Sequence, residues 1–582
     1  MKVATCAIPT RREKMSGNAA HERLLRALDA LGEPAPAYAR KRARARSSTV
    51  VEQIAAVAHS LASRSRVDTP AVAPALAAGA RMVVHHLAPC VAAVLLIVIV
   101  HAPSIVLALP LLATCAMCAS SWQLRRSLWC AGPVQPGVYH GSGTRAAAIG
   151  ARLRAVSASY SATRWLWNGD LQTFYPFMCF AKPPSMRYRR CWFAAPSHGD
   201  RGDPRRDAPT ETEHELLALD WSFPHAGHDP SAPVALVLHG LNGGSAESYV
   251  LDFVHVATYE WGWTCVVMNA RGLGGTRLRS SQPFHAARTS DVAHALAAIG
   301  AAAPGATIVG VGFSLGAVIL SNYVGISGRD CALSAAVAVS GCWDNVANDR
   351  CTAYGKAVYH PWLALELKRN FLTGEPAATL EAGGRVDLRA ARSAATRTIS
   401  DFDAAVVVPF FGFDDLDDYY RCSSLGHHGK LASAAVPLLA LHAADDPIID
   451  SATFADHLPA ITGRTADRPG SHAGNPHLFV LVTRSGGHIG WCEGLAPARR
   501  RWGFIHRVVA EFVGAVRDAA RESDCSSAAG GSRASGGGTR QRRRSSSRSP
   551  TTPPTWHGLS APKATPHLTA TRRVPPARRR MA

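Results

Sequence analysis

Residues 306–320 read ATIVGVGFSLGAVIL, in which a β-rich apolar run leads into the pattern Gly-x-Ser-x-Gly and then an apolar helix start. Ser314 stands at the centre of this pattern, between Gly312 and Gly316. A serine on a sharp strand-to-helix turn needs glycines at these positions, because the strand and the helix approach each other closely there. The stretch therefore predicts a parallel strand, a strained turn and a helix, with the Ser314 hydroxyl exposed as a candidate nucleophile.

Two later apolar runs end in groups that can activate such a nucleophile. The run VPLLAL ends shortly before Asp445 and Asp446, and the run LFVLV ends shortly before His488 in a glycine-rich loop. A serine hydroxyl is a poor nucleophile until a base takes its proton, and the base needs a third group to fix its tautomer. The order serine, acid, histidine predicts Ser314 as nucleophile, His488 as general base and then acid, and Asp446 as the orienting acid. Asp445 remains an alternative to Asp446.

Acyl chemistry also requires backbone N–H donors for the negative charge that develops on the carbonyl oxygen. An apolar run over residues 233–238 is followed by His-Gly-Leu-Asn-Gly-Gly at residues 239–244. A His-Gly turn after such a strand can supply one donor, and the residue after the nucleophile supplies the other. We therefore expect the backbone N–H groups of Leu241 and Leu315 to form the oxyanion hole.

Several further stretches carry a family resemblance. They are NGDLQT (168–173), MRYRR (186–190), LDW (219–221), NARGLGG (269–275), FD (402–403), FGF (411–413), DYY (418–420) and SS (423–424). With the serine, acid and histidine motifs, they resemble family 4 of the AB-hydrolase superfamily. That family includes embryogenesis-associated-protein-like members and the animal membrane-anchored phospholipases and monoacylglycerol lipases. The chain departs from the family pattern at Asp170, where histidine is common, and in a polar insertion at residues 198–215.

The resemblance covers about residues 160–520 and implies an α/β-hydrolase fold. In this fold a mostly parallel sheet carries helices on both faces, with the catalytic groups at the carboxyl ends of the strands. We expect this domain at residues 150–521. The aromatic-rich segment 342–430 lies between two core strands and is a candidate cap over the nucleophile.

A long apolar run precedes this domain. No Asp, Glu, Lys or Arg occurs between Arg81 and Arg125, and residues 87–120 are almost wholly apolar. A bilayer core requires about 20 such residues as a helix, and residues 101–104 (HAPS) interrupt the run. We expect residues 87–121 to be a membrane anchor with a single kinked or tilted span; a re-entrant hairpin and a buried pair of soluble helices are the alternatives. The favoured location is the endoplasmic reticulum or another endomembrane, with the topology left open.

The two ends of the chain are basic. Lys and Arg number 63 against 42 Asp and Glu, which gives a net charge of +21. From Ser526 onward there is no acid, and eleven Arg and one Lys supply 12 of these charges within a Gly-, Ser- and Pro-rich sequence. Such a sequence cannot bury enough apolar surface to order itself. We expect a largely disordered basic region at residues 1–86, a disordered basic tail at 522–582, and no nucleic-acid partner.

Neither a cofactor nor a metal site is expected. Cys115 and Cys118 lie inside the apolar run, the paired histidines lack partners at ligand spacing, and the glycines in NARGLGG do not form a dinucleotide fingerprint. The expected function is that of a membrane-anchored serine hydrolase that cleaves carboxylic esters through an acyl-enzyme. Its expected substrates are lipid-like or small-molecule esters, namely monoacylglycerols, phospholipids or medium- and short-chain acyl esters. The alternatives are an acyltransferase that passes the acyl group to an alcohol and a non-catalytic membrane scaffold with the hydrolase fold.

Overall fold

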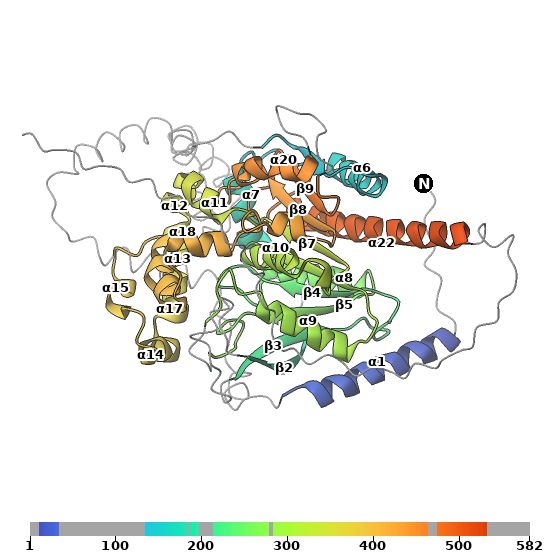
Figure 1. Cartoon of the computed structure of the whole chain (residues 1–582), viewed down its shortest axis with the longest axis horizontal. Coiled ribbons are helices and arrows are strands. Elements are labelled where there is room, and N and C mark those ends of the chain that lie inside the picture. Colours follow the sequence, from blue (N-terminus) through green and yellow to red (C-terminus); the bar gives the residue numbers. More distant parts are fainter. Residues whose placement is uncertain are drawn as a thin grey trace, which may run out of the picture. The chain divides into compact units, whose positions relative to one another are not determined.

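The structure is a computed structural model, and it describes residues 11–33, 134–181, 183, 186–196, 214–278, 283–463 and 474–531. These residues contain a nine-stranded sheet with the order β1-β9-β8-β7-β6-β4-β5-β3-β2; Figure 1 labels all of these strands except β1 and β6. The strands are β1 (Gly137–His140), β2 (Arg189–Pro196), β3 (His214–Ser222), β4 (Val234–Leu238), β5 (Thr264–Asn269), β6 (Ile308–Phe313), β7 (Ala335–Val339), β8 (Leu438–Ala443) and β9 (Leu478–Thr483).

Strands β4 to β9 run parallel. At the edges of the sheet, β1 pairs antiparallel with β9, and β3 pairs antiparallel with both β2 and β5. This arrangement confirms the expected mostly parallel sheet. Because the central strands are parallel, their carboxyl ends meet at one edge, which we call the catalytic edge.

Helices cover both faces of the sheet, because its central strands are apolar throughout and must be shielded on both sides. Val337 and Val339 of β7 join one buried cluster, and Ala336 and Ala338 join the other. Over the first cluster lie α6 (Thr144–Ala158), α8 (Ser248–Tyr259) and α22 (Gly503–Gly531). Over the second lie α1 (Arg11–Leu31), α9 (Ser290–Ala302), α10 (Leu315–Ser327) and α20 (Leu458–Thr462).

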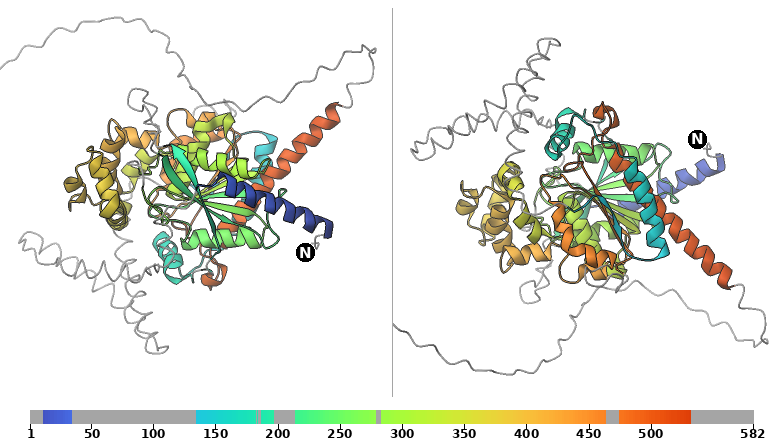
Figure 2. Two further views of the ribbon diagram at one scale, coloured as in Figure 1. Left: turned by 90° about the horizontal axis from the view of Figure 1, so that it is seen from below. Right: turned by 90° about the horizontal axis from the view of Figure 1, so that it is seen from above.

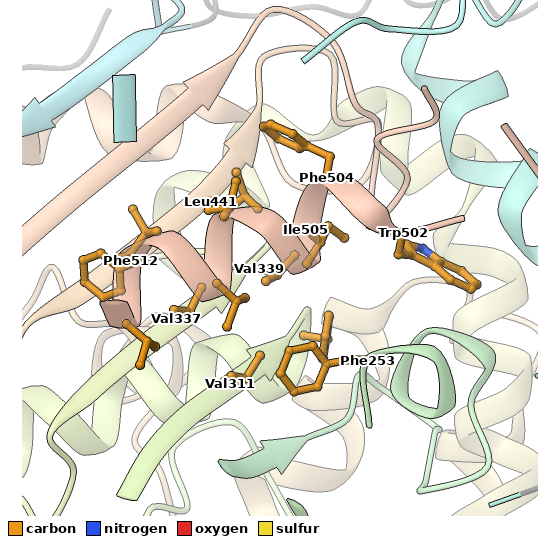
Figure 3. Close-up of a cluster of buried hydrophobic side chains, with 14 of the residues drawn as sticks. Phe253, Val311, Val337, Val339, Leu441, Trp502, Phe504, Ile505 and Phe512 are labelled. Atoms are coloured by element: carbon orange, nitrogen blue, oxygen red, sulfur yellow. The ribbon is translucent and has the colours of Figure 1, made fainter. Parts of the chain in front are cut away.

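Helix α22 shows how a sequence pattern builds this core. Phe504, Val508, Phe512 and Val516 recur every four residues, and all four side chains are buried. An apolar stripe at this spacing predicts a helix that packs against the core. Figure 3 shows Phe504 and Phe512 in one apolar cluster with strand residues such as Val337.

Within residues 1–86, which the sequence predicts to be largely disordered, the structure describes one helix. This helix, α1, lies against α9, and Ala20, Leu24 and Leu28 are buried in the contact. These three residues recur every four positions, so they share one face of the helix. The composition of the whole region obscured this short pattern.

The folded part of the chain also extends beyond the predicted limits of 150–521. Both β1 and α6 begin before residue 150, and β1 forms one edge of the sheet. Helix α22 continues to Gly531, past the expected start of a disordered tail at residue 522.

The predicted cap segment, 342–430, is helical. Between β7 and β8 the chain forms α11 (Asn345–Cys351), α12 (Ala353–Val358), α13 (His360–Phe371), α14 (Gly374–Ala382), α15 (Leu388–Arg392), α16 (Ile399–Phe402), a π-helical turn (Asp403–Val407), α17 (Val408–Phe411), α18 (Leu416–Cys422) and α19 (Lys430–Ser433). Figure 2 shows most of these helices gathered on the side of the sheet away from α1. They enclose an apolar cluster of their own, which reaches Leu241 and Leu315 at the catalytic edge.

The remaining elements are α7 (Gly169–Cys179), α21 (Pro497–Arg500) and two 3-10 turns, Gly328–Asp330 and Ser451–His457. Within the described ranges, no helix has both the length and the apolar character needed to cross a membrane. The predicted anchor, residues 87–121, lies outside those ranges.

Candidate active site

Ser314 occupies the strained turn that its sequence motif predicts. It lies between β6 and α10 with φ 52° and ψ −118°, a backbone conformation that costs a non-glycine residue about 1–3 kcal/mol. A Cβ atom on Gly312 would lie 2.5 Å from the carbonyl oxygen of Gly316, and one on Gly316 would lie 2.5 Å from that of Leu238. Both glycines are therefore required by the close packing of strand and helix around the serine.

The structure brings the predicted nucleophile, base and acid into one chain of hydrogen bonds. His488 Nε2 lies 2.9 Å from Ser314 Oγ, and His488 Nδ1 lies 2.9 Å from Asp446 Oδ2. With an ionised Asp446, the Nδ1 proton is donated to the carboxylate, so the Nε2 lone pair faces the serine hydroxyl and can accept its proton. This is the geometry that activation of Ser314 requires.

Asp446 is held in its ionised form. Its Oδ1 accepts hydrogen bonds from the backbone N–H groups of Ile448 and Ile449, at 2.9 and 3.0 Å. Burial alone would raise the pKa of Asp446, but its contact with His488 outweighs burial and holds the pKa below its usual value. A carboxylate in this state can orient the imidazole and stabilise its protonated form.

The two neighbouring carboxylates have different contacts. Asp445 Oδ1 accepts from the backbone N–H of Gly487, at 2.9 Å, whereas Asp446 contacts the ring of His488 itself. Asp445 therefore contributes to the position of the histidine loop. Of the two candidates that the sequence left open, Asp446 is the one that lies against the imidazole in this structure.

Helix α7 supports the histidine loop and explains the NGDLQT motif. Asn168 caps the helix by accepting from the N–H of Leu171, at 2.9 Å. Thr173 Oγ1 accepts from the backbone N–H of His488 at 2.8 Å, and Gln172 Oε1 accepts from that of Cys492 at 2.8 Å. The role of this motif is not evident from local sequence, because its contacts with the histidine loop lie more than 300 residues away along the chain.

Asp170, where the family pattern commonly has histidine, joins the same helix to the cap. Its carboxylate is buried and accepts from the hydroxyl groups of Tyr354 and Tyr359, at 2.9 and 2.6 Å. Tyr354 lies in α12, and Tyr359 is the residue that precedes α13. The departure from the family pattern therefore falls at a contact between the cap and the catalytic edge.

The loop that bears Leu241 lies beside the serine. A Cβ atom on Gly240 would lie 3.3 Å from the Cβ atom of Ser314. Among the described residues, neither the N–H of Leu241 nor that of Leu315 has a hydrogen-bond partner. Both groups remain available to a developing oxyanion, as their predicted role requires.

A buried histidine fixes the shape of this loop. His239 Nε2 accepts from the backbone N–H of Ala270 at 3.1 Å, so Nδ1 carries the proton and donates to the carbonyl oxygen of Gly240 at 2.8 Å. Burial lowers the pKa of His239, which keeps the ring neutral. Tyr249 holds the other side of the turn, because its hydroxyl oxygen accepts from the N–H of Gly240 at 2.9 Å.

Three of the other resemblance motifs converge behind the same loop. The Asp220 carboxylate accepts from Arg190 at 2.6 and 2.7 Å, from the Asn269 side chain at 2.9 Å and from the Ser245 hydroxyl at 2.5 Å. Asn269 Oδ1 in turn accepts from the backbone N–H of Ser245 at 3.0 Å. MRYRR, LDW and NARGLGG therefore meet in one buried polar network that anchors residues 239–245.

In the part of the chain that the structure describes, no three His, Cys, Asp or Glu side chains gather closely enough to hold a metal ion. The cysteines whose side chains the structure describes are free thiols, namely Cys179, Cys191, Cys265, Cys331, Cys342, Cys351, Cys422 and Cys492.

Comparison with known proteins adds a family assignment. Residues 233–490 match the family described as the alpha/beta hydrolase fold. The chain is 29% identical over 378 residues to phospholipase ABHD3 of Mus musculus, covering 63% of this chain and 81% of that protein. It is 28% identical over 366 residues to monoacylglycerol lipase of Saccharomyces cerevisiae, covering 58% and 76%. It is 30% identical over 303 residues to embryogenesis-associated protein EMB8 of Picea glauca, covering 50% and 62%.

The family match contains every strand from β4 to β9, the Ser314 turn and the loops that bear Asp446 and His488. It confirms the resemblance drawn from the sequence motifs. Over these residues the chain has the alpha/beta-hydrolase family pattern, and it is similar to the ABHD3 and EMB8 proteins.

Proposed function

We propose that the protein is a membrane-anchored serine hydrolase that cleaves lipid-like carboxylic esters through an acyl-enzyme on Ser314. The observation that carries this proposal is the continuous series of hydrogen bonds from Asp446 through His488 to Ser314, with 2.9 Å at each step. Serine, histidine and aspartate in this arrangement are the parts of a charge-stabilised nucleophile.

In the first half of the reaction, Ser314 Oγ attacks the ester carbonyl carbon while His488 Nε2 takes the hydroxyl proton. The carbonyl π electrons move to the oxygen, and the N–H groups of Leu241 and Leu315 stabilise the resulting charge. The intermediate then collapses, the bond to the leaving alcohol breaks, and the His488 imidazolium gives its proton to that alcohol. The products of this half are the free alcohol and an ester of Ser314.

In the second half, water replaces the alcohol. His488 takes a proton from the water as its oxygen attacks the acyl carbon, and the same two N–H groups stabilise the second tetrahedral intermediate. Collapse breaks the bond to Ser314 Oγ, which recovers its proton from His488. The net reaction consumes one ester and one water and releases one alcohol and one carboxylic acid.

Two observations favour lipid-like substrates. Leu241 and Leu315 pack against the apolar cluster of the cap, which includes Val318 and Phe371, so an acyl chain bound at the serine would meet apolar side chains. Relatives of this chain are named as a phospholipase and a monoacylglycerol lipase. The apolar run at residues 87–121 would hold the enzyme at a membrane, with the endoplasmic reticulum or another endomembrane as the favoured location.

Active-site labelling of the full-length chain tests the nucleophile. We expect a fluorophosphonate probe to label the wild-type protein and to leave Ser314→Ala unlabelled, with kcat for p-nitrophenyl butyrate reduced roughly 10⁶-fold in the variant. Thermal unfolding of both proteins checks that the variant is folded. Labelling of folded Ser314→Ala at the wild-type level would exclude Ser314 as the nucleophile. Product analysis with an added alcohol then distinguishes hydrolysis from acyl transfer.

A further inference from the structure

Large apolar side chains are exposed together beside the active site. Among the described residues, seven such side chains are exposed: Leu31, Trp165, Trp167, Met178, Ile326, Trp362 and Leu495. Four of them, Trp165, Trp167, Met178 and Leu495, belong to α7, to the segment before it and to the loop before α21. We call the surface formed by these four side chains and by the exposed Arg164, Arg499 and Arg500 the Trp surface.

Two distant segments are joined to make this surface. The N–H of Thr163 donates to the carbonyl oxygen of Cys492, at 2.9 Å, and that of Gly494 donates to Ser161, at 3.1 Å. The Trp165 indole N–H then donates to the carbonyl oxygen of Leu495, at 3.0 Å. The surface therefore has a defined structure, although its outermost side chains, Trp167 and Leu495, are 68% and 84% exposed.

Helix α7 extends the same surface. The Trp165 ring makes an edge contact with Tyr175, with ring centroids 5.0 Å apart. Met178 follows Tyr175 by three residues and therefore lies on the same side of the helix. An exposed group of two tryptophans, a leucine and a methionine is larger than single scattered apolar residues and indicates a binding surface.

The charges around the Trp surface are positive. Arg164, Arg499 and Arg500 are exposed, and none forms an ion pair within the described part of the chain. The nearby Glu493 is buried and is paired with Arg507, at 2.7 Å. Unpaired arginines beside exposed tryptophans are complementary to a binding partner that is apolar in its interior and anionic at its boundary, as a lipid bilayer is.

The Trp surface adjoins the catalytic edge. Gly169, two residues after Trp167, lies so close to Asp445 that a Cβ atom on it would be 1.7 Å from the Asp445 carbonyl oxygen. At the other segment, Leu495 follows His488 by seven residues. The surface therefore leads directly into the two loops that position His488.

The chain from the predicted anchor enters the fold at this edge as well. Val134 donates its N–H to Ser451 Oγ, at 3.1 Å, just before β1. Gly137, the first residue of β1, pairs with Val482 near the carboxyl end of β9. Twelve residues separate Val134 from the end of the anchor predicted at residues 87–121. A membrane anchor at that position would tether the domain within about 43 Å of the bilayer, the longest span of twelve extended residues.

We propose that the Trp surface docks on an anionic lipid bilayer and presents the Ser314 site to esters in that bilayer. The proposal rests on the proposed function, because it concerns how the same site reaches lipid substrates. Trp167, Met178 and Leu495 enter the boundary between headgroups and acyl chains, where amphipathic tryptophan side chains are favoured. The arginines contact lipid phosphates and carboxylates at the rim.

The test compares two substrates in the full-length protein. One is a fluorogenic monoacylglycerol analogue in phosphatidylcholine vesicles, with or without phosphatidylserine, and the other is soluble p-nitrophenyl butyrate. The variants are Trp167→Ser/Leu495→Ser, which removes the apolar contacts, and Arg164→Gln/Arg499→Gln/Arg500→Gln, which removes the charges. The matched control is Ile326→Ser, because Ile326 is 55% exposed near the end of α10 that points away from the catalytic edge.

We expect Trp167→Ser/Leu495→Ser to lower hydrolysis of the vesicle substrate about tenfold, while soluble-ester hydrolysis stays at the wild-type level. The arginine variant should lose the stimulation that phosphatidylserine gives to the wild-type protein. Brominated phosphatidylcholine should quench less tryptophan fluorescence in Trp167→Phe than in the wild-type protein. The Ile326→Ser control should behave as wild type on both substrates.

Several results would overturn the docking proposal. Vesicle rates that do not change in the first two variants would show that another surface, such as one for a protein partner, is responsible for access to lipid. An equal loss on both substrates in folded variants would make the Trp surface part of the catalytic structure. A failure of the proposed function is distinguishable, because then the wild-type protein would hydrolyse neither ester and would not react with the fluorophosphonate.

Discussion

The catalytic edge of the sheet and the cap are organised in different ways. Ser314, Asp446 and His488 each follow a strand that is buried along its whole length, so the core of the sheet sets their positions. The cap consists of helices of four to twelve residues, too short to be stable alone. Chemistry is therefore positioned by the core, whereas the cap depends on its attachments.

Those attachments include buried polar contacts. Lys430 at the end of the cap donates from Nζ to Asn322 Oδ1 at 2.7 Å and to the carbonyl oxygens of Cys422 and Ser424 at 2.6 and 3.0 Å. Burial lowers the pKa of Lys430 to about 8. Because Asn322 belongs to α10, which follows the nucleophile, this contact joins the end of the cap to the central layer of the protein.

The beginning of the cap has a second attachment. Asp344, which caps α11, lies 3.1 Å from Nε2 of both His427 and His457. Burial would raise the pKa of Asp344, but its hydrogen bonds with His457 and the backbone, together with its contact with His427, outweigh burial and lower the pKa. One carboxylate thus connects the first helix of the cap to its last loop and to the turn before α20.

The largest expected difference in kcat is between two variants in which one of the adjacent carboxylates, Asp446 or Asp445, is replaced by an amide. We expect Asp446→Asn to lower kcat for p-nitrophenyl butyrate about 10⁴-fold, because the amide cannot hold the required tautomer of His488. Asp445→Asn should have a much smaller effect, because Asp445 accepts from the backbone N–H of Gly487 in the histidine loop, whereas Asp446 contacts the imidazole ring. Steady-state kinetics of both variants checks this difference. A reversed order of the two losses would identify Asp445 as the orienting acid.

The catalytic edge and the cap also differ in how much of each can be predicted from the sequence. Ser314, His488 and the pair Asp445 and Asp446 were found because each follows a local apolar strand, which is a short-range signal. The choice between the two acids was not accessible, since it depends on side-chain directions that adjacent residues do not reveal. The contacts of Asp170 with Tyr354 and Tyr359 could not be predicted either. These tyrosines lie 184 and 189 positions later in the chain, and no local sequence pattern indicates such contacts.

The cap and the catalytic edge are also joined at the oxyanion loop. Asn242, next to the expected donor Leu241, donates from Nδ2 to the carbonyl oxygen of Leu363 at 3.3 Å and accepts from Asn370 Nδ2 at 3.0 Å. Leu363 and Asn370 both belong to α13 of the cap. Asn242 has φ 60°, a left-handed conformation that asparagine and glycine adopt readily. Glycine can therefore replace it without new backbone strain.

This contact provides a matched pair of variants. We expect Asn242→Gly and Asn370→Ala each to lower kcat for a soluble short ester about tenfold with little change in KM, because a displaced oxyanion donor weakens binding of the transition state only. The double variant should be no slower than either single variant. Asn242→Asp, which still accepts from Asn370, should recover part of the rate. Additive losses, or a change in KM alone, would show that the cap does not act through this loop.

The smallest expected effect concerns a buried acid inside the cap. Asp403 is buried, Oδ2 accepts from the Tyr420 hydroxyl at 3.2 Å, and burial raises the pKa of its carboxyl from 3.8 to about 8. Between these values the folded chain keeps a proton that the unfolded chain releases, so the stability it contributes falls as pH rises from about 4 to about 8. Asp403→Asn is neutral throughout this range and keeps an acceptor for Tyr420.

We therefore expect the thermal midpoint of the wild-type protein to fall more between pH 5 and pH 8 than that of Asp403→Asn. Glu381→Gln, which removes an exposed carboxylate from α14, should retain the wild-type slope. Equal slopes in the wild-type protein and Asp403→Asn would mean that Asp403 is ionised in the folded cap.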